Sequence, residues 1–323
     1  MRRRRLAGVL LALLAAGTAG FALRAWQDFN TPGPLAETRR VVVPKGAGLA
    51  PLASLLTERG VLRDALAFRI FVIVDGAQNR LKAGEYDFPA GVSAASVRDM
   101  LVAGRTVIHR LTVPEGLTTA AVLELLRNTE RLVGELPNPG EGRLLPETYY
   151  YSYGDSRAGL VARMQRAMDE ALARLFRARP PDSPLKSETE LLTLASIVEK
   201  ETGMSAERAR VAGVFINRLK RRMRLQTDPT VIYALTGGQP LGRALTRADL
   251  RLDHAYNTYR NHGLPPGPIA NPGLAALEAS ARPADTDALY FVADGAGGHL
   301  FARTLREHNR NVARYRKLSR RAR

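Results

Sequence analysis

Two glutamates at the end of an apolar segment are the residues of this chain best suited to chemistry. Glu199 and Glu201 close the run of residues 191–202, with only Lys200 between them. A carboxyl group pressed against apolar surface has a raised pKa, because burial disfavours its charged form. A proton donor that works near neutral pH needs that environment. The segment therefore suggests acid–base catalysis.

Helical spacing separates the two glutamates. At 3.6 residues per turn they point roughly 200° apart, so they cannot share one task. Glu201 falls between Leu194 and Ile197 on the edge of the apolar stripe, whereas Glu199 falls on the other flank, nearer the polar side marked by Ser196. We therefore predict that Glu201 is the catalytic acid and Glu199 a supporting residue. The alternative is that both glutamates only form ion pairs with basic neighbours.

Further polar side chains follow this segment and are candidates for binding a substrate. Gln226 and Thr227 belong to a polar loop suited to sugar hydroxyls or to backbone groups. Asp228, followed by proline, fits a helix cap with proline in the first turn. Asn257 and Tyr259 belong to a second polar segment. The neutral side chains among these candidates are suited to positioning a substrate. Asp228 has the alternative role of capping a helix.

The residues needed for several other kinds of catalysis are absent from the sequence. The chain has no cysteine, which excludes disulfides, thiolate metal sites and cysteine nucleophiles. Its 5 histidines show no metal-ligand spacing, although His299 and His308 could line a groove. No nucleophile elbow or phosphate-binding loop is present. We expect neither a metal nor a cofactor.

The elements that must position these residues are mixed. Hydrophobic periodicity predicts helices over residues 65–74, 157–177, 206–220 and 229–235, strands over 84–88 and 288–293, and a hairpin leading into 299–301. Residues 40–46 and 110–116 each read as a β-rich run with a Pro-x-Gly turn, followed by an amphipathic helix over 52–56 and 122–126. The fold class is α+β, with a small βα module preceding a larger mixed domain.

The N-terminal sequence indicates that the rest of the chain is exported across the membrane. Four arginines at positions 2–5 precede residues 6–23, which carry no charge. That length suits a membrane span, and the arginines hold the N-terminus in the cytoplasm. The alternative is a cleaved signal peptide. In either case the remainder is exported, with residues 24–39 as a linker.

The formal net charge of +17 does not by itself indicate nucleic-acid binding. Part of it flanks the predicted anchor, and part lies in the basic tail at residues 314–323. An exported protein meets anionic lipid headgroups and acidic wall polymers rather than nucleic acid. The alternative is a solvated basic surface with no partner.

Six motifs in this chain resemble those of the endolytic murein transglycosylases, the YceG-like or MltG family. They are ASIVEKET at 195–202, VFINRL at 214–219, LQTDPTVIY at 225–233, YNTY at 256–259, GLPPG at 263–267 and LYFVADG at 289–295. The motifs are long, and with the anchor and the early β-rich module the resemblance covers nearly the whole chain.

The resemblance implies a lyase that cuts peptidoglycan glycan strands between N-acetylmuramic acid and N-acetylglucosamine. The muramyl 6-hydroxyl attacks C1 and leaves a 1,6-anhydro end, so one glutamate suffices, whereas water-using glycosidases need two carboxylates. A glutamate followed by serine or threonine is typical of lytic transglycosylases, and Glu201-Thr202 fits that pattern. Gln226, Thr227, Asn257 and Tyr259 are then candidates for holding the 6-hydroxyl.

The resemblance also implies a domain plan and partners. Residues 1–5 are cytoplasmic, 6–23 anchor the chain in the plasma membrane, 24–39 link, 40–108 form a LysM-like wall-binding module and 109–323 form the catalytic domain. Cell-wall synthases are expected partners, with the enzyme terminating glycan elongation. Two alternatives remain open: a water-using muramidase with Glu199 or Asp228 as second carboxylate, and a non-catalytic wall-binding scaffold.

Overall fold

The structure is a computed structural model that describes residues 2–321, with side chains described at Leu13 and from residue 15 to 318. It is a mixed α+β fold in which small two-stranded sheets accompany the helices. The chain divides into two compact units. The N-terminal unit holds Met1–His109 with Tyr150–Asp155, and the C-terminal unit holds Arg110–Tyr149 with Ser156–Arg323.

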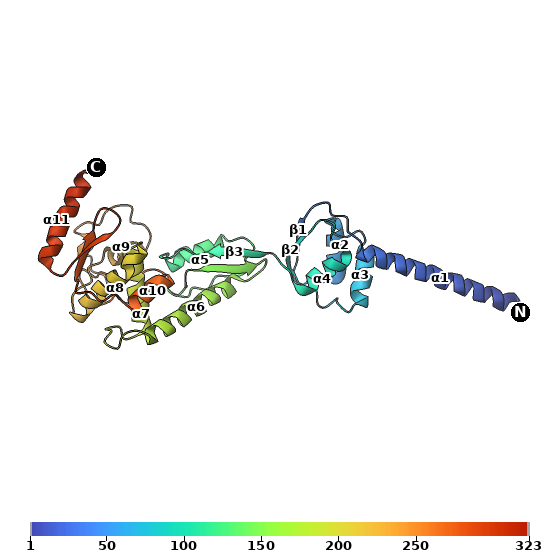
Figure 1. The fold of residues 1–323 in the computed structure, drawn as a ribbon, viewed down its shortest axis with the longest axis horizontal. Helices are drawn as coiled ribbons and strands as arrows, with labels where there is room; N and C mark the ends of the chain where they lie inside the picture. The colour runs from blue at the N-terminus through green and yellow to red at the C-terminus, as the bar shows by residue number, and fades with distance from the viewer. Residues whose placement is uncertain (1, 322–323) are drawn as a thin grey trace. The chain divides into compact units, whose positions relative to one another are not determined.

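The N-terminal unit is built around one antiparallel strand pair. Strand β1 (Arg39–Val43) pairs with β2 (Gly84–Phe88), and Val41 lies opposite Tyr86. Alternate residues of β1 point into the core, as a half-buried strand requires. Besides the N-terminal helix, the unit contains α2 (Leu49–Glu58), α3 (Ala65–Val74) and α4 (Ala94–Ala103) (Figure 1). The predicted helix at 65–74 and strand at 84–88 are confirmed.

The two similar stretches of sequence fold alike. In the first, β1 leads through a turn at Gly46 into α2. In the second, β3 (Ile108–Thr112) leads through a turn at Gly116 into α5 (Thr119–Arg127). Both glycines adopt the left-handed conformation, with φ of 77° and 74°, which residues with a Cβ rarely do. The predicted order of strand, Pro-x-Gly turn and helix is confirmed in both places.

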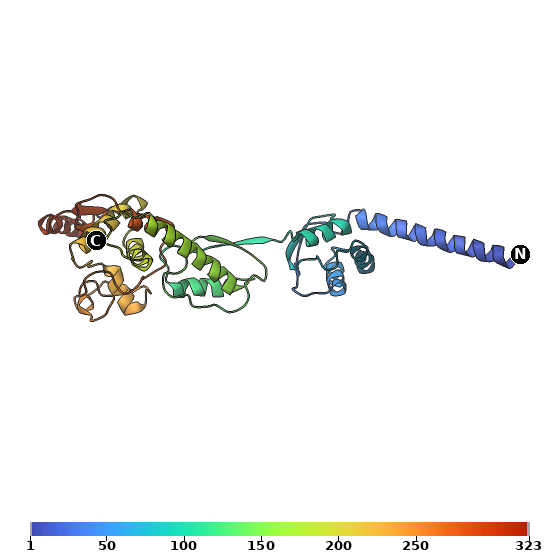
Figure 2. The same cartoon turned by 90° about the horizontal axis from the view of Figure 1, so that it is seen from below.

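Helix α1 (Arg2–Asn30) runs without interruption past the predicted anchor (Figure 2). Its Phe29 is buried, and the ring centroid lies 4.6 Å from that of Phe71 in α3. Leu35 is also buried. Residues 24–39 are therefore helical in their first part and contribute to the core, which differs from the predicted linker. The reason is that Phe29 and Leu35 gain more from packing on the module than from solvent exposure.

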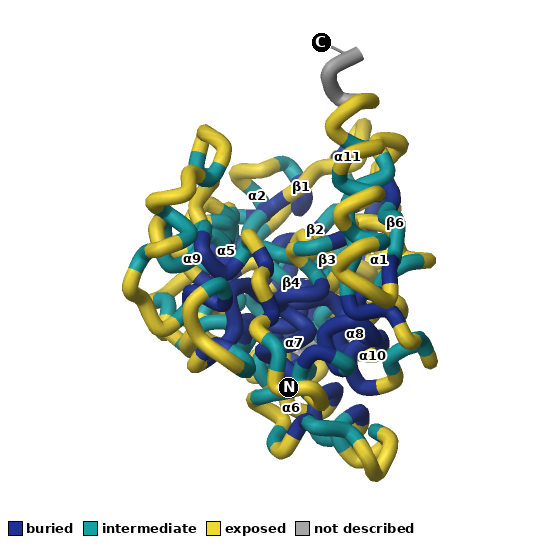
Figure 3. Tube along the Cα trace, turned by 90° about the vertical axis from the view of Figure 1, so that its left-hand side faces the viewer, coloured by how far each residue is buried: buried dark blue, intermediate teal, exposed yellow. Residues whose placement is uncertain are grey.

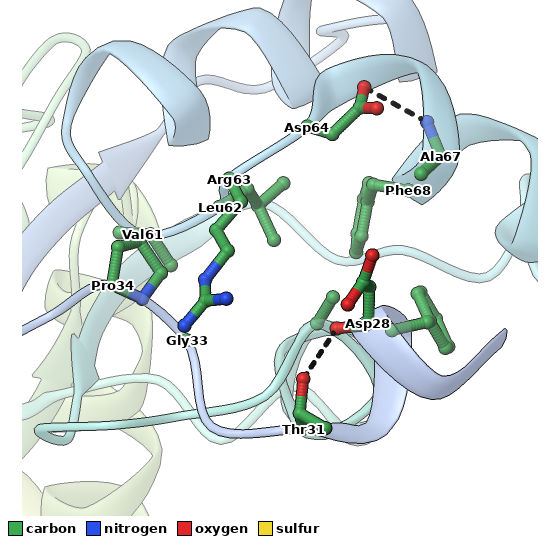
Figure 4. Close-up of a pocket in the computed structure, with 12 residues that line it drawn as sticks. Asp28, Thr31, Gly33, Pro34, Val61, Leu62, Arg63, Asp64, Ala67 and Phe68 are labelled. Atoms are coloured by element: carbon green, nitrogen blue, oxygen red, sulfur yellow. Dashed lines mark hydrogen bonds between the residues drawn. The ribbon is translucent and has the colours of Figure 1, made fainter. Parts of the chain in front are cut away.

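Part of the anchor prediction, residues 6–12 and 14, concerns side chains outside the described ones. Within the part of the chain that is described, no helix combines the length and the apolar character needed to cross a bilayer. A small cavity of about 40 Å³ lies beside the end of α1, between Asp28, Arg63 and Phe68 (Figure 4). There the Asp64 carboxylate accepts backbone N–H groups and caps α3. This cavity has room for water alone.

The C-terminal unit is built around α7 (Glu188–Glu201). It contacts α6 (Arg157–Arg177), α8 (Ser205–Lys220) and α10 (Leu274–Ala281). Residues 191–198 of α7 are all buried, and the tube around α7, α8 and α10 is mostly dark blue in Figure 3. The prediction that α7 has one apolar and one polar face was therefore wrong, because helices pack around α7 on several sides.

Ser196, which marked the predicted polar side of that helix, is fully buried. Its hydroxyl donates to the Thr193 carbonyl over 2.8 Å and accepts the Ile269 N–H over 3.0 Å. A small polar side chain is tolerated in a core when both its hydrogen bonds are made. Serine was thus a poor indicator of an exposed face.

The remaining elements form the other parts of this unit. They are β4 (Thr148–Ser152), which pairs with β3 and has residues in both units, α9 (Asp228–Thr236), a 3₁₀ turn (Asp249–Arg251), β5 (Tyr290–Ala293), β6 (His299–Ala302) and α11 (Leu305–Arg321). Strands β5 and β6 form the predicted antiparallel hairpin. The predicted helices at 157–177, 206–220 and 229–235 are confirmed.

The predicted cap of α9 was wrong by one residue. Asp228 is the first helical residue, Thr227 occupies the cap position, and neither side chain caps the helix. The carboxylate of Asp228 accepts a hydrogen bond from Tyr259 instead.

Candidate active site

Glu201 is the last residue of α7 and lies on the wall of an open groove of about 640 Å³. The helix ends there because Thr202 is extended, with its hydroxyl accepting the Met204 N–H. The other walls are Arg218 of α8, the loop that enters α9, strand β5 and the first turn of α11. All of them belong to the C-terminal unit.

A buried threonine cluster holds the Glu201 carboxyl. The Thr227 hydroxyl donates to Glu201 Oε2 over 2.8 Å. The Thr227 N–H in turn donates to the Thr258 hydroxyl over 3.1 Å, and the hydroxyls of Thr230 and Thr258 lie 2.9 Å apart. Gln226, just before, has a φ of 48°, a conformation that a non-glycine residue adopts only under constraint. This strained turn directs Thr227 toward Glu201.

The surroundings raise the pKa of Glu201. Burial has the largest effect, because it disfavours the carboxylate, and the negative charge of Asp228 acts in the same direction. The hydrogen bond from Thr227 and the charges of His299 and Arg218 oppose it. A carboxyl in this balance keeps its proton at higher pH than an exposed glutamate, as a general acid requires.

Tyr259 and Asp228 form a second polar pair on the groove wall. The phenol hydroxyl donates to Asp228 Oδ1 over 2.6 Å. Burial, and after it the hydrogen bond to Asp228, raises the pKa of Tyr259. The phenol therefore stays protonated and acts as a donor, which fixes the direction of this hydrogen bond.

Arg218, Tyr290 and His308 close the groove. Arg218 is buried, and its guanidinium donates to the carbonyls of Leu289 and Leu225, each over 2.6 Å. It thereby joins the hairpin to the loop before α9. The guanidinium also lies 5.2 Å from the centre of the Tyr290 ring, which stacks on His308. Burial and the charge of Arg218 lower the pKa of His308, so its imidazole is neutral at neutral pH.

Glu199 lies apart from the groove. Its side chain is only 6% exposed, and one carboxylate oxygen accepts the Gly273 N–H over 3.0 Å at the start of α10. The other oxygen lies 3.5 Å from Arg208, which also pairs with Glu115. Burial raises the pKa of Glu199 as well. The expectation that Glu199 lies on a polar side was wrong, because α10 covers it.

Comparison with known proteins places this geometry in a family. The family model described as YceG-like matches residues 41–314. The chain belongs to the YceG-like family. A Bacillus subtilis relative named endolytic murein transglycosylase is 33% identical over 310 residues, covering 86% of this chain and 85% of that protein.

Two further relatives extend the match. A Streptococcus pneumoniae protein of the same name is 31% identical over 95% of this chain, which spans 64% of that protein's length. A crystal structure of a YceG-like protein from Listeria monocytogenes is 31% identical, with a TM-score of 0.52, and the match covers 85% of this chain and 99% of that one.

In this YceG-like chain the predicted site residues divide into two groups. Glu201, Gln226, Asp228 and Tyr259 line the groove, and Thr227 bonds Glu201 directly. Glu199 does not line it, and Asn257 is fully buried. The Asn257 amide donates to two backbone carbonyls of residues 250 and 252 and accepts the Tyr259 N–H. Asn257 therefore shapes the loop that carries Tyr259.

Sequence reasoning missed Arg218 and Tyr290. Arg218 had a signal that could have found it, since it follows the apolar stretch 211–216 of α8. Charged residues are rarely buried without partners, so an arginine at that place indicates carbonyl acceptors nearby. His308 lines the groove as proposed, whereas His299 instead pairs with Glu207 over 2.7 Å. Within the described residues no three acidic or histidine side chains gather as metal ligands.

Proposed function

We propose that this chain is an endolytic peptidoglycan lytic transglycosylase, a lyase that cuts the bond between N-acetylmuramic acid and N-acetylglucosamine within glycan strands. One observation carries the proposal: a carboxyl with a raised pKa, Glu201, lies on an open groove whose lining also includes Gln226 and Tyr259. Relatives named endolytic murein transglycosylase supply the substrate class.

The chemistry needs only that carboxyl. Protonated Glu201 donates its proton to the glycosidic oxygen, and the C1–O bond breaks as positive charge develops on the muramyl ring. The resulting carboxylate then takes the proton from the muramyl 6-hydroxyl, whose oxygen bonds to C1 and closes the 1,6-anhydro ring. No water is consumed. The remaining task is to hold the 6-hydroxyl close to C1, which is a matter of positioning.

The groove residues have separate parts in this reaction. The Thr227 hydroxyl orients the Glu201 carboxyl and stabilises the carboxylate formed after the first step. Asp228 contributes negative charge beside the developing positive charge, and its hydrogen bond from Tyr259 keeps the carboxylate in place. Gln226 and Tyr259 supply polar groups for sugar hydroxyls on the same wall.

The two rival functions fit less well. A water-using muramidase needs a second carboxylate on the groove, and Glu199 is instead committed to Gly273 and Arg208. Asp228 is the only one of the two predicted alternatives that lines the groove, so it is the residue on which that rival depends. A non-catalytic scaffold gives no reason for burying Glu201 against a threonine donor.

The sequence supports a location at the membrane. We propose that residues 6–23 anchor the chain once in the plasma membrane with the N-terminus in the cytoplasm, and that the catalytic domain is extracytoplasmic. We further propose that residues 40–108 form a LysM-like module that binds the wall. Cell-wall synthases nearby would supply nascent strands, whose elongation the enzyme terminates.

Digestion of purified sacculi separates the three functions. The detergent-solubilised chain is incubated with sacculi, and mass spectrometry identifies the soluble products. We expect 1,6-anhydro-muramyl ends. Reducing ends would establish a muramidase, and the absence of any released glycan would favour the scaffold.

A further inference from the structure

Helix α3 exposes an apolar face that the fold of its own unit does not use. Phe68 and Val72 point into the core. On the opposite face lies an aliphatic stripe of four side chains spaced as on one side of a helix. They are Leu66, Ile70, Ile73 and Val74, which are 59%, 48%, 54% and 74% exposed. Apolar side chains gathered on one exposed face of a helix mark a site of interaction with a protein or a membrane.

The aliphatic stripe lies close to where the proposed anchor leaves the membrane. The proposed span ends at Leu23, and Trp26, the single tryptophan of the chain, is 56% exposed. Tryptophan is enriched at the membrane–water interface. Phe29 follows about 5 Å further along the helix, at 1.5 Å per residue. Its ring lies against Phe71 of α3, and Figure 1 shows α3 beside this end of α1.

The charges around the stripe suit an anionic lipid surface. Arg63 and Arg69 are exposed, just before α3 and within it. Of the nearby carboxylates, Asp64 caps α3 and Asp75 pairs with Arg98, whereas Asp28 at the end of α1 is exposed. An apolar helical face with basic flanks is the pattern of helices that lie in the headgroup region.

We propose that the aliphatic stripe of α3 docks on the bilayer surface and holds the N-terminal unit against the membrane. The proposal rests on the proposed anchor, because the anchor fixes the distance between α3 and the lipid. Docking gives the wall-binding unit one fixed orientation, so it meets glycan strands where they leave the membrane-bound synthases.

Single cysteines test this directly, because the chain has none of its own. Ile70→Cys, Ile73→Cys, Leu13→Cys and Ala103→Cys full-length variants are labelled with an environment-sensitive dye. They are reconstituted in phosphatidylglycerol–phosphatidylethanolamine vesicles that carry nitroxide lipids. Leu13→Cys reports the anchor. Ala103→Cys is the matched control on the same unit, at the far end of α4 from Ala94, which lies beside Phe29.

Docking predicts that headgroup nitroxides quench the dye at positions 70 and 73 and leave the dye at 103 bright. Quenching at 13 by deep nitroxides, with 70 and 73 no more quenched than 103, would overturn docking and leave the anchor in place. No quenching at 13 would overturn both, while the enzyme activity is judged separately by sacculus digestion. In a Leu66→Cys reporter, adding Ile70→Asp and Ile73→Asp should abolish quenching without changing the circular dichroism spectrum.

Discussion

The hydrogen bond from Thr227 to Glu201 offers the sharpest test of the proposed acid. Thr227→Val keeps the shape of this buried side chain and removes the hydroxyl that donates to Glu201 Oε2 over 2.8 Å. A hydrogen bond to a charged group contributes about 1.5–3 kcal/mol. The loss of this hydrogen bond to the carboxylate should therefore raise the pKa of Glu201.

The direction of the pKa change depends on which form of Glu201 the Thr227 hydroxyl stabilises. Thr227 donates to the carboxylate and so lowers the pKa of Glu201. The reaction starts from protonated Glu201, so activity falls as pH rises through this pKa. Thr227→Val should therefore move the alkaline limb of kcat/KM to higher pH, measured as release of anhydro-muramyl products across a pH series.

Two variants control this experiment. Asp228→Asn removes the negative charge that raises the pKa of Glu201, so it should move the alkaline limb to lower pH. Thr193→Val removes a buried hydroxyl of α7 that donates to the Thr189 carbonyl and has no bond to the threonine cluster, so it should leave the limb in place. An alkaline limb that stays fixed in Thr227→Val, or moves to lower pH, would refute the assignment of Glu201 as the acid.

Three further predictions concern stability and the separation of the two glutamates. Burial raises the pKa of Glu201 in the folded chain, so the stability of the fold falls as pH rises above the pKa of this group in the unfolded chain. Glu201→Gln should therefore abolish cleavage and yet raise Tm at neutral pH. Calorimetry at acid pH should show no such gain in Tm. Glu199→Gln should keep cleavage, and loss of cleavage in a folded Glu199→Gln protein would contradict the separation of the two glutamates. Glu199→Leu leaves the Gly273 N–H without its acceptor. This variant should lower the free energy of unfolding, measured in urea, by about 1–3 kcal/mol. Gly213→Ala would place a Cβ 2.6 Å from the Ala284 carbonyl oxygen, so its unfolding free energy should fall by about 1–3 kcal/mol, and an unchanged urea midpoint would be inconsistent with that packing.

Local patterns were enough to predict most elements. Periodicity and turn residues located α3, α6, α8, α9 and the hairpin, because each depends on neighbours in sequence. The same reasoning failed at α7, where Ser196 looked polar. A helical wheel shows which residues share a face, but it does not show how many other helices pack around that segment in the folded protein.

The site was predictable in type more than in detail. The wheel separated Glu199 from Glu201, and the structure directs them to different partners, Gly273 and Thr227. The role of Asp228 could not be read locally, because Tyr259 lies 31 residues further along the chain. Arg218 was missed although it follows an apolar stretch, because one of its carbonyl acceptors, Leu289, lies 71 residues further along the chain.

Digestion of sacculi in H₂¹⁸O tests the central claim most directly, namely that Glu201 alone drives attack by the substrate's own hydroxyl. Wild-type protein and Glu201→Gln are compared, and the muramyl ends are analysed by mass spectrometry. The account predicts anhydro ends without ¹⁸O from the wild type and no product from the variant. Reducing ends that carry one ¹⁸O atom, or full activity in Glu201→Gln, would contradict it.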